Sequence, residues 1–275
     1  MREKINLLKA FFKINLTNVG DLPFKVNFAV TYKCNYKCRT CNIWKIYLAN
    51  PVKMQAELRI DEIEQIFRNY NHFIWVSLTG GEPFLRSDLL DIINVIYSNC
   101  RNLSILNIPT NGSLPDYIEK KVYEIVNEFK IPLIYITISL DGDENVHNFI
   151  RGNNNAWLKA LDTINRVYQL SQNYSNITVG IEYTLSPFNA GGLKSLIDKL
   201  REYEMTYLLK YIIVTIMHAG ILYHNVESCN IGSRTLHNIP AMIKDIEYLI
   251  KHVSHSMLNP FTAIRYIYLK LLIEY

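Results

Sequence analysis

The sequence is poor in cysteine, and it lacks both long apolar runs and a large excess of charge. Only five cysteines occur among 275 residues, which excludes a small protein held together by a framework of disulfides. The longest apolar runs, such as residues 211–217, are far shorter than the roughly 20 residues that span a bilayer. Residues 1–12 lack the pattern of a secretory signal. These absences predict a cytoplasmic protein without a membrane span.

The composition is that of an ordinary globular protein, with 49% hydrophobic and 20% charged residues. The net charge of +4 is too mild to indicate a nucleic-acid partner, and a solvated surface accounts for it. No internal repeat or low-complexity linker interrupts the chain. A chain of this length can fold as a single α/β barrel.

Hydrophobic periodicity predicts strands that alternate with helices along most of the chain. The predicted strands cover residues 26–31, 73–79, 103–108, 133–140, 177–185 and 207–217. The predicted helices cover residues 3–14, 60–70, 89–97, 157–170, 193–203, 241–253 and 261–273, and one more begins after Ser113, which can cap it. This alternation is typical of βαβ units and a parallel sheet.

Six such units are fewer than a closed TIM barrel needs. The predicted fold class is therefore α/β, as a partial (β/α)6 TIM-like barrel with parallel strands plus N-terminal and C-terminal helices. We expect an N-terminal helical extension over residues 1–22 and a core barrel over residues 23–220. Residues 221–275 are expected to form a C-terminal helical segment.

Three of the five cysteines, Cys34, Cys38 and Cys41, lie within eight residues directly after the first predicted strand. Such crowding in a cysteine-poor chain indicates metal ligation or redox chemistry. A structural zinc site closes with four ligands, and an iron–sulfur cubane normally takes four cysteines. Three thiolates therefore favour a cubane with one iron open to a non-protein ligand, with zinc or a disulfide as the alternatives. Nearby lysine and arginine residues are expected to lower the thiol pKa values.

Other unusual residues also follow predicted strands. Gly80-Gly81-Glu82-Pro83 follows the second strand, Thr110-Asn111-Gly112 follows the third, and Ser139 and Asp141 close the fourth. In parallel α/β folds the chemistry lies at the carboxyl ends of the strands. The positions of these loops therefore predict one site built around the cysteines.

These motifs together resemble the radical S-adenosylmethionine (radical SAM) superfamily, over residues 26–217. The chain is similar to the branch that holds the SPASM maturases and the molybdenum-cofactor GTP cyclase. The resemblance implies that the three cysteines hold a [4Fe–4S] cluster whose fourth iron binds S-adenosyl-L-methionine. It implies an enzyme in which a reduced flavodoxin or ferredoxin supplies an electron, the cofactor is cleaved, and a deoxyadenosyl radical abstracts hydrogen from a substrate.

The resemblance also implies roles for single residues. The loop from Gly80 to Pro83 would receive the methionine ammonium, with Glu82 as a negative partner or as a loop-fixing residue. The further candidates for contact with S-adenosylmethionine are Thr110, Asn111, Ser139, Asp141, Arg151 and Ile181. Caps, turns and loop fixing are the structural alternatives for the polar residues of this set.

Two departures from the family pattern limit the functional prediction. Thr40 stands where many members have an aromatic residue, and Tyr36 or Trp44 could compensate. After the barrel only Cys229 remains for an auxiliary cluster, so either a minimal core enzyme or a fragment is expected. The substrate class, peptide or small molecule, stays open. A non-catalytic iron–sulfur electron carrier or a degenerate scaffold is the alternative function, although the intact Gly80–Pro83 loop argues against it.

Overall fold

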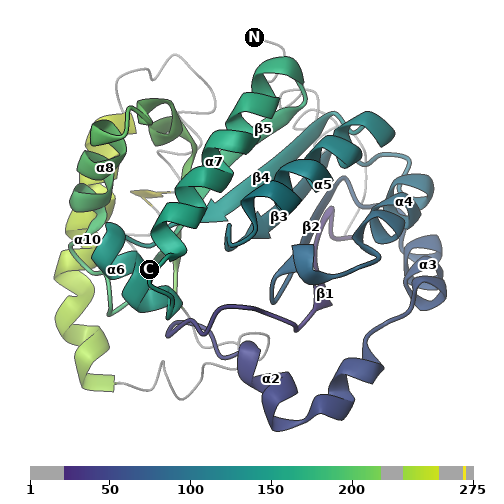
Figure 1. The fold of residues 1–275 in the computed structure, drawn as a ribbon, viewed down its shortest axis with the longest axis horizontal. Coiled ribbons are helices and arrows are strands. Elements are labelled where there is room, and N and C mark those ends of the chain that lie inside the picture. Colours follow the sequence, from purple (N-terminus) through teal and green to yellow (C-terminus); the bar gives the residue numbers. More distant parts are fainter. Residues whose placement is uncertain (1–21, 218–231, 254–268, 271–275) are drawn as a thin grey trace. The chain divides into compact units, whose positions relative to one another are not determined.

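A computed structural model describes residues 22–217, 232–253 and 269–270 of the chain (Figure 1). Six strands form one sheet in the sequential order β1 to β6, and every strand pair with a described register is parallel. The strands are β1 (Lys25–Thr31), β2 (Trp75–Gly80), β3 (Ile105–Thr110), β4 (Leu133–Ser139), β5 (Ile177–Leu185) and β6 (Ile212–Ile216). This order confirms the predicted α/β fold.

Helices follow the strands along the chain. The α-helices are α2 (Trp44–Ala49), α3 (Ile60–Asn69), α4 (Leu89–Asn99), α5 (Pro115–Glu128), α6 (Glu144–Arg151), α7 (Ala156–Asn173), α8 (Leu193–Glu202) and α10 (Gly232–Val253). Short 3-10 helices are η1 (Pro51–Ala56), η2 (Pro83–Leu85) and η3 (Thr206–Tyr211). None of the helices in the described ranges is long and apolar enough to cross a membrane.

The structure corrects several predicted elements. The segment Thr206–Tyr211 is a 3-10 helix, so the sixth strand is shorter than predicted. Ser113 does not cap α5, because Leu114 holds the cap position without a side-chain hydrogen bond. The sequence pattern missed α2 and α6, which have six and eight residues. The predicted helix over 3–14, most of the one over 261–273, and Cys229 lie outside the described residues.

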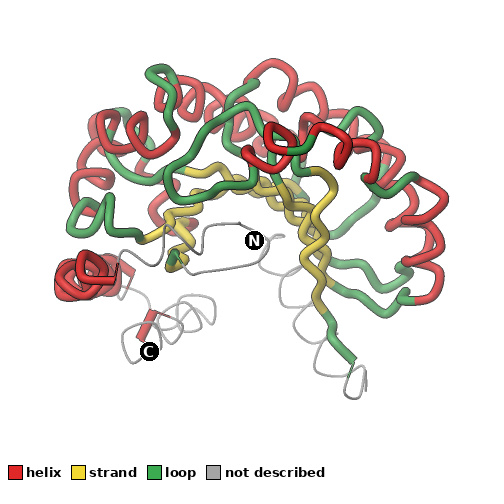
Figure 2. Tube along the Cα trace, turned by 90° about the horizontal axis from the view of Figure 1, so that it is seen from below, coloured by secondary structure: helices red, strands yellow, loops and turns green. Residues whose placement is uncertain are grey.

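The chain divides into two compact units, which we describe separately. The first contains Met1–Lys37, Asn42–Ser139 and Leu158–Gly180, and the second contains Cys38–Cys41, Leu140–Trp157 and Ile181–Tyr275. In the first unit the helices lie on one side of the strands (Figure 2). Helix α3 buries Ile63 and Phe67, which have helical spacing, and the Phe67 ring packs edge-on against Phe28 at 5.3 Å.

In the second unit β6 pairs with β5, from Ile181 opposite Ile212 onward. Helix α8 begins at Leu193. Backbone amides at its start donate hydrogen bonds to a side chain of α10. The buried Asp245 of α10 accepts hydrogen bonds from Gly191 N at 2.7 Å and from Leu193 N at 3.1 Å. A carboxylate at a helix N-terminus stabilises the helix through its unpaired amides and dipole.

Candidate functional site

The two glycines after β2 lie directly against the start of the cysteine stretch. Gly81 N donates to Thr31 O at 2.7 Å, and Glu82 N donates to Lys33 O at 2.8 Å. A Cβ on Gly81 would lie 2.2 Å from Lys33 O, and one on Gly80, whose φ is +123°, would lie 2.2 Å from Thr31 O. The glycines are therefore required by backbone contact with residues 31–33, a neighbour that the sequence pattern did not identify.

The Glu82 side chain joins the loops that follow β2 and β3. Its carboxylate is fully buried and accepts hydrogen bonds from Thr110 Oγ1 at 2.8 Å, Asn111 N at 2.7 Å and Phe84 N at 3.2 Å. The Thr110 hydroxyl also accepts from Gly112 N at 3.1 Å. A buried carboxylate needs such donors, because it has lost its hydration. Of the two roles predicted for Glu82, the structure displays the loop-fixing one.

Asn111 connects this arrangement to the first cysteine. Its Nδ2 donates to Asn35 Oδ1 at 2.9 Å and lies 3.8 Å from Cys34 Sγ. Asn35 Nδ2 in turn donates to Ser113 Oγ at 2.7 Å. The sequence interpretation missed Asn35, although its position beside Cys34 was a usable signal.

Cys38 has a charged neighbour in the second unit. Its Sγ lies 3.7 Å from Arg151 Nη1, and Arg151 Nη2 pairs with Asp141 Oδ2 at 2.6 Å. Thr184 N donates to Asp141 Oδ1 at 3.3 Å. Burial raises the pKa of the Cys38 thiol, and the Arg151 cation partly offsets this effect. The expectation that nearby cations lower the thiol pKa is therefore wrong for Cys38, because desolvation outweighs the effect of Arg151, the one cation that acts on it among the described residues.

Residues 38–41 are held on the end of α6. Arg39 N donates to Ile150 O at 2.8 Å, and the Arg39 guanidinium lies 4.1 Å from the Phe149 ring centroid. His147, which is fully buried, accepts from Asp141 N through Nδ1 at 3.1 Å. Burial and the Arg151 cation hold the pKa of His147 well below its usual value.

The structure thus gathers the predicted residues into two groups. In the first unit Asn111 reaches Cys34 and is bonded through Glu82 to Thr110 and the Gly80–Pro83 loop. In the second unit Arg151, which pairs with Asp141, reaches Cys38. Ser139 ends β4 half-buried, and Ile181 is buried in β5.

The cysteine environment fits an iron–sulfur cluster. All three cysteines are free thiols, and thiolates are the ligands that iron–sulfur clusters take. The amide of Asn111 and the guanidinium of Arg151 both reach sulfur, and N–H donors to sulfur tune such clusters. Within the part of the chain that the structure describes, no group of three or more histidine, cysteine, aspartate or glutamate side chains is placed to hold a metal ion.

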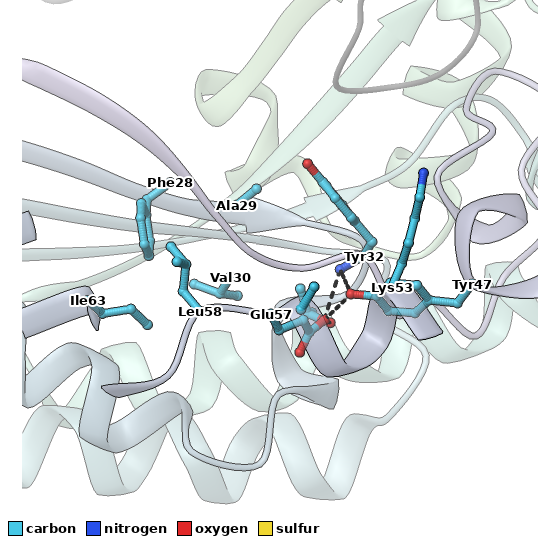
Figure 3. A pocket seen from close by; sticks show the side chains of 11 residues that line it. Phe28, Ala29, Val30, Tyr32, Tyr47, Lys53, Glu57, Leu58 and Ile63 are labelled. Carbon is cyan, nitrogen blue, oxygen red and sulfur yellow. Dashed lines mark hydrogen bonds between the residues drawn. The ribbon is translucent and has the colours of Figure 1, made fainter. Parts of the chain in front are cut away.

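A second, partly buried network, missed by the sequence interpretation, lies at the end of β1 (Figure 3). Glu57 accepts hydrogen bonds from Thr31 Oγ1, Tyr32 N and the Tyr47 hydroxyl. It also pairs with Arg86 Nη1 at 2.9 Å. Thr31, Tyr32, Tyr47 and Glu57 border a cavity of about 190 Å³. The network ties the segment after α2 to the strand that carries the cysteine stretch.

Arg86 has further partners in the same network. Its Nη1 donates to Val30 O at 3.0 Å, its Nη2 donates to Leu58 O at 2.7 Å, and the guanidinium pairs with Asp88. The Arg86 side chain is only 9% exposed. Arg86 therefore joins the backbone of β1 at Val30 to the backbone of Leu58, the residue after Glu57.

Comparison with known proteins places these motifs in a family. The family model described as Radical SAM superfamily matches residues 28–190. The chain is 26% identical to the Fe-coproporphyrin III synthase of Methanosarcina barkeri, over 67% of this chain and 43% of that protein. It is 26% identical to the radical SAM cyclopropyl synthase TigE of Paramaledivibacter caminithermalis, over 70% of this chain and 49% of that protein. The chain thus spans about half the length of these curated relatives.

The fold has a solved counterpart. The structure of native anSMEcpe with bound AdoMet superposes with a TM-score of 0.58 at 16% identity, covering 86% of this chain and 62% of that one. At this identity the likeness concerns the fold alone.

Proposed function

The chain belongs to the radical SAM superfamily, and on that premise we propose that Cys34, Cys38 and Cys41 hold three irons of a [4Fe–4S] cluster. The family uses this cluster together with S-adenosylmethionine, which would complete the fourth iron. When bound, this pair supplies one-electron cleavage of S-adenosylmethionine and a deoxyadenosyl radical that abstracts hydrogen from a substrate.

One observation carries this proposal: the buried Glu82 carboxylate joins the Gly80–Pro83 loop to Asn111, whose amide reaches Cys34. The loop that we propose to receive the methionine group is thus hydrogen-bonded, through Glu82, to Asn111, which lies beside the proposed iron ligand Cys34. All of these residues belong to the first unit. The intact Gly80–Pro83 loop beside a proposed iron ligand argues against a degenerate scaffold. It also disfavours a simple electron carrier, which needs no such loop.

The remaining residues have proposed supporting roles. Thr110, Asn111 and Ser139 would contact or shape the pocket for S-adenosylmethionine, and Ile181 would offer an apolar surface to the adenine. Arg151, itself held by Asp141, would position the Cys38 thiolate. We keep residues 23–220 as the proposed core domain, the cytoplasm as the compartment, and flavodoxin or ferredoxin as the electron donor. The substrate is proposed only as a peptide, a protein or a small molecule.

The test is anaerobic reconstitution with iron and sulfide, followed by electron paramagnetic resonance of the reduced protein with and without S-adenosylmethionine. A cubane signal that S-adenosylmethionine perturbs, and release of deoxyadenosine, are the expected results. Cys38→Ala should lose both the iron and the signal. Cys100→Ala is the matched control, because Cys100 is buried away from the cluster motif and should keep both. A cluster that never yields deoxyadenosine would contradict the proposal.

A further inference from the structure

The positive charge of this chain is concentrated around the cysteine stretch. Residues 32–56 contain five lysine or arginine residues and no aspartate or glutamate. The whole chain has a net charge of only +4, so the residues outside this stretch carry a net charge of −1. A mild overall charge therefore hides one strongly basic segment.

Four lysines present this charge on the first unit: Lys33, Lys37, Lys45 and Lys53. All four are exposed, and none makes an ion pair with a described residue. The Nζ atoms of Lys37 and Lys45 both lie near the Trp44 ring, at 5.9 and 5.4 Å from its centroid. By contrast Lys121, Lys194 and Lys199, on other helices, are each paired with a carboxylate.

Glu57 and Asp88, which line the cavities beside these lysines, are engaged with an arginine rather than with a lysine. Both pair with the buried Arg86, and neither makes an ion pair with one of the four lysines. Lys53 and Lys33 border the two cavities that share Thr31 and Glu57. In Figure 3 the Lys53 side chain extends away from the bonds between Glu57 and Tyr47.

An exposed apolar strip lies among the lysines. Leu48, Val52 and Met54 are 68%, 67% and 45% exposed, and residues 48–56 are exposed without interruption. The ends of this strip are nevertheless anchored, because Tyr47 and Glu57 are bonded to each other and Glu57 to Arg86. The surface therefore consists of exposed apolar side chains flanked by lysines, and hydrogen bonds and an ion pair fix the backbone segment that carries them.

We propose that this surface, formed by Lys33, Lys37, Lys45, Lys53, Leu48, Val52 and Met54, docks an acidic flavodoxin. The inference rests on the proposed function, and it names where the electron donor binds. The exposed apolar edge of a flavin ringed by carboxylates complements an apolar strip ringed by lysines. Electron-transfer encounters use small interfaces, and charge complementarity steers them. One electron leaves the reduced flavin and enters the cluster, whose proposed ligand Cys34 lies between Lys33 and Lys37.

The first experiment measures binding, independently of activity. Oxidised flavodoxin of net negative charge is titrated by calorimetry into the cluster-loaded protein at low and at moderate salt. The wild type should bind, and its affinity should fall with salt, because exposed charges are screened. The double variant Lys45→Glu with Lys53→Glu should bind about tenfold or more weakly.

The matched control reverses two charges at the other ends of the strands of the same unit. Arg101 and Lys130 are exposed in the loops that enter β3 and β4. The double variant Arg101→Glu with Lys130→Glu should bind flavodoxin like the wild type. Circular dichroism and iron content verify the fold of each variant, and Lys45→Gln with Lys53→Gln, a milder change, should give an intermediate loss.

The second experiment compares two reductants. Deoxyadenosine release driven by reduced flavodoxin should fall about tenfold in the Lys45→Glu, Lys53→Glu variant, while release driven by dithionite should change far less. Salt-independent binding, an equal loss in the control variant, or an equal loss with both reductants would overturn the proposal. So would preferential binding of a ferredoxin, of RNA or of an acidic peptide. Absence of dithionite-driven release in the wild type would instead refute the proposed function.

Discussion

Two buried carboxylates, one in each unit, are stabilised in different ways. Glu82, after β2, accepts three hydrogen bonds from neutral donors, two of them backbone amides. Asp141, after β4, pairs with the Arg151 guanidinium. Each carboxylate fixes the surroundings of one cysteine, Cys34 or Cys38. In the first unit neutral hydrogen-bond donors stabilise the buried carboxylate, whereas in the second unit a cation does. Substitutions in the two units should therefore lower the free energy of unfolding by different amounts.

The largest effect is expected from Glu82→Ala. It leaves the donors of Phe84, Thr110 and Asn111 buried without an acceptor, at about 1–3 kcal/mol for each donor. The free energy of unfolding should fall by about 5 kcal/mol, measured by urea denaturation of the metal-free protein. Glu82→Gln keeps one oxygen acceptor and should lose about half as much. An alanine variant of wild-type stability would show that these bonds do not hold the loops.

Arg151→Ala tests the charged arrangement. It leaves Asp141 buried without its cation, and breaking a buried ion pair costs about 3–5 kcal/mol. The double variant Arg151→Met with Asp141→Asn removes both charges and should recover most of the loss in the same denaturation experiment. If the double variant is no more stable than Arg151→Ala, the packing of Arg151 matters more than its charge.

Gly80→Ala examines the close contact between β2 and the start of the cysteine stretch. The new Cβ would meet Thr31 O and would also impose a strained φ, so we expect a loss of at least about 2 kcal/mol. Gly191→Ala is the control, because Gly191 also has a positive φ but its Cβ would lie 3.7 Å from the nearest atom. That variant should lose only about 1 kcal/mol. Equal losses would mean that backbone strain, not the contact with Thr31, requires the glycine.

The smallest effect concerns pH and is confined to the second unit. Because the pKa of His147 is lowered in the folded state, the unfolded chain binds a proton more readily. Above the usual histidine pKa of about 6.5, His147 should therefore have no effect on the free energy of unfolding. Below that pH, the free energy of unfolding should fall by about 1 kcal/mol per pH unit. Denaturation of wild type and His147→Gln between pH 7 and 5 checks this. A wild-type curve no steeper than that of the variant would contradict it.

Much of the fold was predictable because periodicity is a local property. Strand β5 was predicted at its observed bounds, and the other strands of the first five within a few residues, since each is a short apolar run bounded by turns. Helix α6 was missed because its first turn depends on Asp143, whose side chain accepts from Val146 N, and its last on Gly152 in the left-handed region. Neither residue produces an apolar period.

The sequence by itself determined the strand and helix alternation and the spacing of the three cysteines. It also determined the Gly-Gly-Glu-Pro motif, and these features sufficed to predict the family. Only the tertiary structure decided what those residues contact: the donors around Glu82, the cation beside Cys38, and the pairing of Glu57 with Arg86. The physical reason is that these contacts join residues far apart in the chain, and each depends on burial, which removes water as the competing partner.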